Sequence, residues 1–190
     1  MTRGSSAVWI GVGVTLLASC GAGDVEPTAA DDPAWGEPAP SPTDPPAPEL
    51  LRHSAGVVLT VPTGWQVDPG EGPLRMAPPD GSLLARFTVL DTADLDRALA
   101  AIDERLDRRL AAHDLGSDRA TVVGGLQARL ASGSGQVKGE PVKLRIALVL
   151  TPRGQVLALV AMVRRDAPAH RLGELSDLVT SIRAATLKER

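Results

Sequence analysis

Residues 142–163 read VKLRIALVLTPRGQVLALVAMV, which is two apolar runs separated by a turn signal. The turn segment TPRG has Pro152 at its second position and Gly154 at its fourth, a pattern typical of a tight turn. The first run alternates apolar residues with Lys143 and Arg145, so one face of the strand is partly polar. The second run, VLALVAMV, is apolar throughout, which predicts a central strand covered on both faces. We therefore expect two antiparallel neighbouring strands here.

Shorter strand signals precede this hairpin. Gly- and Pro-containing turns separate most of them, and Trp65, after one such turn, is expected to be a core residue and not part of a binding surface. Gly124 and Gly125 indicate a bend or bulge at the start of a strand. The sequence SGSG at 132–135 predicts a flexible connection between strands. The predicted shorter strands are residues 57–61, 65–67, 74–77, 83–90, 120–123 and 126–130.

Two segments have the spacing of amphipathic helices. The first can be capped by Asp91 or Thr92 and stopped by Gly116, with His113 near its end interacting with the helix dipole. The second begins near Pro168. Strands on both sides of the first helix predict an α+β fold with a mainly antiparallel sheet flanked by helices. The apolar stripes are Leu95, Leu99, Ile102, Leu106 and Leu110 in the first helix, and Leu172, Leu175, Leu178, Val179 and Ile182 in the second.

Composition excludes several classes of protein. The 190 residues have a formal net charge of −3, with one Cys and three His. No segment is basic enough to bind nucleic acid, and one Cys cannot form an intrachain disulfide. His53, His113 and His170 are too scattered for a common zinc site. Neither a Walker loop nor a nucleophile elbow is present, so we expect no catalytic residues, no metal and no cofactor.

The amino terminus has the features of a bacterial export signal. Arg3 precedes an apolar run at residues 7–18, which is too short to span a hydrocarbon core of ~30 Å. The run ends in Leu17-Ala18-Ser19-Cys20, which closely resembles the lipobox of bacterial lipoproteins. The resemblance implies that residues 1–19 are removed and that a diacylated Cys20 anchors the chain in a membrane. An ordinary secretory signal followed by an incidental Cys is the alternative.

Residues 20–50 are predicted to be a disordered tether. Positions 21–50 contain eight prolines and seven acidic residues, and no basic one, so this segment cannot bury enough apolar surface to fold. Residues 51–190 are then a single domain, which we expect to be a monomer in the cell envelope, on the periplasmic or extracellular side of a bacterial membrane. Gly21 stands where Asp often retains lipoproteins on the inner membrane, and so favours the outer membrane where the cell has one.

Three parts of the predicted domain resemble the PsbP-like α/β/α sandwich. They are residues 56–65, which read GVVLTVPTGW, residues 123–128, which read VGGLQA, and the closing hairpin with its helix. That superfamily includes DcrB-type and LpqN-type bacterial lipoproteins, photosystem II extrinsic proteins and a Ran-release factor. The resemblance implies a role in binding proteins or other partners, and it offers no catalytic residues.

These observations predict a membrane-tethered, non-enzymatic module that binds an unknown envelope protein or peptide. Lys143 and Arg145 are the candidate partner-binding residues, on the sheet face or edge beside their strand, where they would steer an acidic or amphipathic partner. Solvated edge-strand charges that discourage aggregation are the alternative for this pair. A carrier that holds a lipid or other apolar small molecule between sheet and helix is a second hypothesis, and an enzyme is a third.

Overall fold

The computed structural model describes residues 48–69 and 73–185. Two helices and mostly antiparallel strands give the predicted α+β fold. The predicted signal segment, the lipobox with Cys20 and nearly all of the predicted tether lie outside the described residues. In chain order the described elements are β1 (Glu49–His53), β2 (Val57–Val61), β3 (Gln66–Asp68), β4 (Arg75–Ala77), β5 (Leu83–Leu90), α1 (Leu95–Asp107), β6 (His113–Val123), β7 (Leu126–Val137), β8 (Glu140–Leu150), β9 (Val156–Arg164), α2 (Ala169–Thr180) and β10 (Arg183–Ala184).

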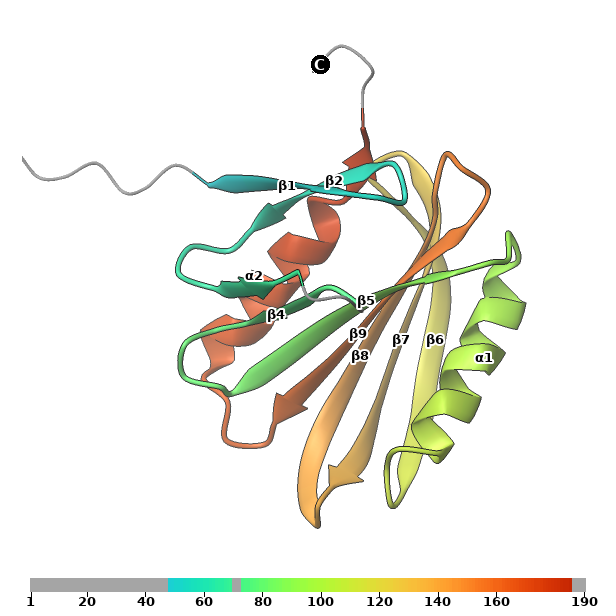
Figure 1. The fold of residues 1–190 in the computed structure, drawn as a ribbon. Coiled ribbons are helices and arrows are strands. Elements are labelled where there is room, and N and C mark those ends of the chain that lie inside the picture. Colours follow the sequence, from blue (N-terminus) through green and yellow to red (C-terminus); the bar gives the residue numbers. More distant parts are fainter. Residues whose placement is uncertain (1–47, 70–72, 186–190) are drawn as a thin grey trace, which may run out of the picture. The chain divides into compact units, whose positions relative to one another are not determined.

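The larger sheet has seven strands in the order β3-β4-β5-β9-β8-β7-β6, with antiparallel pairing between neighbours. Strand β9 is the middle strand, as its continuous apolar sequence predicted, and the hydrogen bond from Gly154 N to Thr151 O closes the predicted turn to β8. A smaller sheet has the order β1-β2-β10. Figure 1 shows the strands of the large sheet side by side, with α1 at one side of it.

Side chains on the two faces of the large sheet form separate cores, because successive residues of a strand point to opposite faces. One core joins the sheet to α2 and the small sheet and includes Trp65, Phe87 and Leu159. The other joins the opposite face to α1 and includes Ile102, Leu106 and Ile146. The result is an α/β/α arrangement in which each helix covers one face of the sheet.

Helix α1 begins later and ends earlier than the cap signals predicted. The carboxylate of Asp94, not Asp91 or Thr92, accepts hydrogen bonds from Asp96 N and Arg97 N at 2.8 and 3.1 Å. The helix ends at Asp107, and both His113 and Gly116 belong to β6. His113 therefore does not cap the helix. Its Nε2 lies 2.7 Å from Asp103 Oδ1, so it ties the start of β6 to the side of α1.

The hairpin of β6 and β7 decides two further predictions. Gly124 and Gly125 form its two-residue turn, with φ of 53° and 80°, so the predicted bend at the start of a strand is present and the alternative of a bulge is wrong. The SGSG segment lies inside β7 and is not a flexible connection. Its Gly133 is needed where the register of β6 shifts, because a Cβ there would overlap the carbonyl oxygen of Asp114.

Strand β8 lies between β9 and β7, so its backbone edges are paired. The option that Lys143 and Arg145 act at a sheet edge is therefore wrong, and so is the alternative that they are edge-strand charges. In the large sheet the edge strands are β3 and β6. Only the sheet face remains as a surface on which these two side chains can meet a partner.

Helices α1 and α2 have 13 and 12 residues, about 20 and 18 Å at 1.5 Å per residue. Within the described ranges, no helix combines the length and the apolar character that crossing a bilayer requires.

Candidate functional site

A groove of about 570 Å³ lies between α2 and the large sheet. Its wall is one side of α2, from which Leu172, Leu175 and Val179 point toward the sheet. Its floor includes Leu130 and Leu159, which lie on the sheet face that α2 covers. The groove therefore offers an apolar surface to a ligand that enters between the helix and the strands.

Two arginines line the same groove. Arg145 of β8 lies opposite Ser132 of β7, and Arg119 of β6 lies opposite Leu130, so strand alternation places both on the α2 face. Arg145 is partly buried and its Nη1 donates a hydrogen bond to Leu144 O at 3.1 Å, whereas Arg119 is exposed. Neither makes an ion pair with a carboxylate of the described residues. Both guanidinium groups are therefore able to bind an acidic ligand.

The remaining polar groups of the groove are mainly hydroxyls. The hydroxyls of Ser117 and Ser132 are 2.9 Å apart across β6 and β7, and Ser176 lines the groove from α2. Asp118 also borders the groove, but strand alternation directs its carboxylate to the α1 face, where it accepts a hydrogen bond from Arg129 Nε at 2.5 Å. An apolar body with an acidic group is the ligand chemistry that this combination accommodates.

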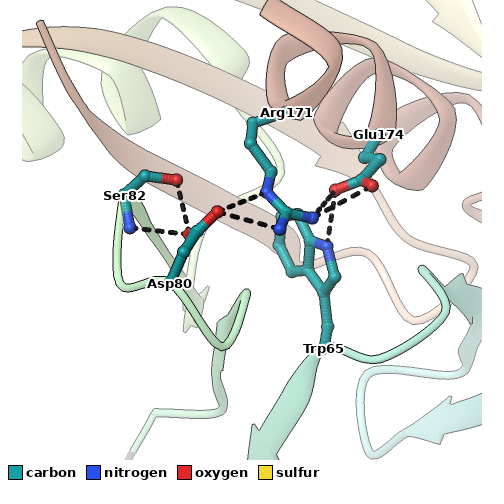
Figure 2. Close-up of polar contacts among 5 residues, drawn as sticks. All are labelled: Trp65, Asp80, Ser82, Arg171 and Glu174. Carbon is teal, nitrogen blue, oxygen red and sulfur yellow. Dashed lines mark hydrogen bonds and ion pairs between the residues drawn. The ribbon is translucent and has the colours of Figure 1, made fainter. Parts of the chain in front are cut away.

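A polar cluster fixes the helical wall of the groove (Figure 2). Arg171 of α2 lies between two carboxylates, with its Nε donating to Asp80 Oδ2 at 2.9 Å and its Nη1 to Glu174 Oε2 at 2.8 Å. Glu174 Oε2 also accepts a hydrogen bond from Trp65 Nε1 at 2.8 Å. Ser82 donates to Asp80 Oδ1 from its hydroxyl at 2.6 Å and from its backbone N–H at 2.9 Å. Helix α2 is thereby joined to the turns that precede β3 and β5.

Hydrogen bonding shifts the pKa values of both carboxyls in this cluster. The two hydrogen bonds from Ser82, helped by Arg171, lower the pKa of Asp80 to about 2. For Glu174, burial favours a higher pKa, but hydrogen bonds from Arg171 and Trp65 outweigh it, and the pKa is lowered overall. Both carboxylates are therefore ionised at neutral pH, and the cluster holds α2 by charge-assisted hydrogen bonds.

The structure brings together only part of the predicted site. Arg145 lines the groove, while Lys143, which is exposed opposite Ser134 on the same face, does not. Cys20, Leu17, Ala18 and Ser19 lie outside the described residues. Trp65 is confirmed as a core residue, with 7% of its surface exposed.

Sequence analysis missed Arg119 and the groove side of α2. Arg119 precedes the segment predicted as a strand, and it becomes a groove residue because β6 begins seven positions before that segment, at His113. The alternation of Ser117, Arg119 and Thr121 with Asp118 and Ala120 was the only local signal. Among residues 48–69 and 73–185, no three His, Cys, Asp or Glu side chains are grouped as metal ligands.

The fold is similar to those of two solved proteins. The solution structure of cyanobacterial PsbP (CyanoP) from Synechocystis sp. PCC 6803 has a TM-score of 0.55 and 12% identity, covering 72% of this chain and 91% of that one. The crystal structure of LpqN, involved in cell envelope biogenesis of Mycobacterium tuberculosis, has a TM-score of 0.50 and 17% identity, covering 67% and 82%. No protein-family model matches the chain, and a search of curated protein sequences finds no match.

At these identities the similarity concerns the fold. The chain has a PsbP-like fold, as the resemblance of its residues 56–65 and 123–128 implied.

Proposed function

We propose that this chain is a membrane-tethered, non-enzymatic accessory protein of the bacterial cell envelope. It acts as a monomer and binds a short acidic, amphipathic segment of another envelope protein. The observation that carries the proposal is the groove between α2 and the sheet, where Arg119 and Arg145 lie beside an apolar floor and wall. Charges of this kind steer and orient an acidic partner, and the apolar surface contributes affinity.

The groove chemistry supports binding over catalysis. The side chains of Arg119 and Arg145 carry hydrogen-bond donors and no acceptor, so neither offers a general base. Asp118 is the one acidic residue among the described lining residues, and its carboxylate is directed to the α1 face, where Arg129 binds it. The hydroxyls of Ser117 and Ser132 face each other, with no imidazole among the lining residues to activate them.

The tethering part of the proposal rests on the lipobox resemblance of residues 17–20, and the fold shared with LpqN, an envelope biogenesis protein, supports the location. Labelled fatty acid should enter the wild-type chain in bacteria and be absent from the Cys20→Ala variant. Equal labelling of the two proteins would refute lipidation at Cys20.

The partner-binding part is tested by photo-crosslinking. A photoreactive residue replaces Thr121, which lines the groove, and captured partners from an envelope extract are mapped by mass spectrometry. We expect one crosslinked segment, with net negative charge, whose yield falls in Arg119→Glu and Arg145→Glu. Lys143→Glu is the matched control, since it reverses a charge on the same face outside the groove. An equal loss of yield in all three variants would contradict a role for the groove.

A carrier of a lipid or other apolar small molecule is the second candidate function. The apolar groove residues favour it, because Leu130, Leu159 and Leu175 suit an acyl chain as well as an amphipathic peptide. Organic extraction of protein purified from bacterial membranes separates the two functions. A stoichiometric lipid that is absent from a Leu175→Asn variant would support the carrier.

A further inference from the structure

A second group of basic side chains lies on the face of the large sheet that α1 covers. Arg75 of β4 and Arg86 of β5 are direct cross-strand partners, and both point away from the core that contains Met76 and Phe87. Directly opposed like charges destabilise an antiparallel pair. On this face Arg75 also lies opposite Asp68 of β3, whereas the other cross-strand partner of Arg86 is Val160 of β9, so Arg86 has no acidic cross-strand partner.

One hydrogen-bond donor of the Arg86 side chain also lacks an acceptor. Its Nε is buried and has no hydrogen-bond partner among the described residues, a condition shared there only with Thr151 Oγ1. An unpaired buried donor costs free energy, and the cost is larger for a charged group. Burial lowers the pKa of Arg86, and so do the nearby charges of Arg109, which follows α1, and of Arg75. Arg75 lies directly opposite Arg86, and the charge of Arg109 also acts on Arg86.

No carboxylate in the described parts of the chain makes an ion pair with Arg75, Arg86 or Arg109. This distinguishes them from Arg129, Arg164 and Arg171, each of which pairs with at least one acidic side chain. A bound anion would neutralise the repulsion between the three groups and supply the acceptor that Arg86 Nε lacks.

We propose that Arg75, Arg86 and Arg109 form a binding site for a phosphate-class oxyanion on the α1 face of the large sheet. Three guanidinium groups can donate to several oxygens at once, and a tetrahedral dianion offers more acceptors and more charge than a carboxylate does. The site lies on the opposite face from the groove, so it is independent of the proposed partner binding. Leu84, which is 38% exposed, lies on the same face two residues from Arg86. Free phosphate and the phosphate of a lipid headgroup both present the required chemistry.

The test uses the full chain with Arg Nε–Hε resonances recorded by NMR. Titration with inorganic phosphate should shift the Arg86 Nε–Hε signal saturably at constant ionic strength. Arg75→Gln and Arg109→Gln, both at exposed positions, should each weaken the apparent affinity about tenfold or more, since each removes charge-assisted hydrogen bonds. Arg183→Gln in β10 is the matched control, because it removes the same charge from the smaller sheet.

A second arm identifies the source of the phosphate. Vesicles of phosphatidylcholine with and without phosphatidic acid are titrated against the same proteins. Binding that requires phosphatidic acid and is lost in Arg75→Gln would identify a lipid headgroup, and saturable binding of free phosphate alone would identify a soluble ligand. Absence of any saturable shift with either probe, or equal weakening by Arg183→Gln, would overturn the proposal.

Discussion

Trp65 Nε1 donates a hydrogen bond to Glu174 Oε2 at 2.8 Å, although 109 positions separate the two residues. The indole is otherwise packed in the core with 7% of its surface exposed, so its polar group finds a partner at the core boundary. Glu174 in turn is bound by Arg171, which also binds Asp80. A core side chain and a surface ion-pair cluster are thus joined at the helix that forms the groove wall.

The indole hydrogen bond should contribute measurably to stability. Trp65→Phe retains most of the buried apolar surface but removes the donor, and we expect a loss of about 1–2 kcal/mol in the free energy of unfolding. Trp65→Ala also removes the buried ring and should cost about 3–5 kcal/mol. Urea unfolding measures both values.

A double-mutant cycle with Glu174→Gln isolates the interaction, since Gln keeps an acceptor but loses the charge. Additive effects of Trp65→Phe and Glu174→Gln would show that the two side chains are not coupled.

Acid should weaken the attachment of α2. A carboxyl whose folded pKa lies below its unfolded value stabilises the fold above the unfolded pKa, and this stabilisation is lost as the pH falls through the folded pKa. For Asp80 that interval runs from 3.8 down to about 2, and Glu174 acts in the same direction. We therefore expect the urea midpoint of the wild type to fall as the pH decreases through this interval.

Asp80→Asn should be less stable than wild type at neutral pH. Its urea midpoint should also fall less steeply than that of the wild type as the pH decreases. Asp177→Asn, at an exposed position of α2, is the control and should keep the wild-type slope of urea midpoint against pH. If the urea midpoints of Asp80→Asn and wild type fell equally steeply with pH, Asp80 would not be the group that causes the loss of stability in acid.

The turn between β6 and β7 provides a matched pair of glycines. Both have positive φ, but a Cβ on Gly124 would overlap the carbonyl oxygen of Ile182, whereas nothing lies within 4 Å of a Cβ on Gly125. Gly125→Ala should cost about 1–2 kcal/mol from its backbone conformation alone. Gly124→Ala must also displace the backbone before β10, and we expect it to cost at least about 1.5 kcal/mol more.

Thermal or urea unfolding of the two alanine variants gives this difference directly. Equal destabilisation would mean that the contact between the hairpin turn and Ile182 is absent in solution.

Local periodicity was sufficient to predict much of this fold. The continuous apolar sequence of β9 predicted its central position, because both faces of that strand contact a core. The helical stripes likewise predicted α1 and α2, since burial of Ile102, Leu106 and Leu175 depends on spacing within one element. Each of these predictions required only residues that are close in sequence.

The failures involve contacts between distant residues. Gly133 appeared to mark flexibility because its neighbours are small and polar, yet its role depends on the backbone of Asp114 in another strand. Strand β6 is exposed at the sheet edge, so most of its length has no apolar alternation to reveal it. Arg171 and Asp80 are 91 positions apart, and no local pattern connects them. Arg119 was missed as a groove residue because it lies in the part of β6 that has no apolar alternation.

Filling the groove should block partner binding without unfolding the protein. Ser176 is exposed on α2 and lines the groove, so Ser176→Trp adds a large side chain there without removing a core contact. We expect at least about tenfold weaker capture of the crosslinked partner, equal to about 1.4 kcal/mol of binding free energy, and a change in unfolding free energy within about 0.5 kcal/mol. His170→Trp adds the same side chain to an exposed position of α2 outside the groove lining and should capture the partner as the wild type does. Because the two variants differ only in where the indole is placed, undiminished capture by Ser176→Trp would exclude the groove as the binding site.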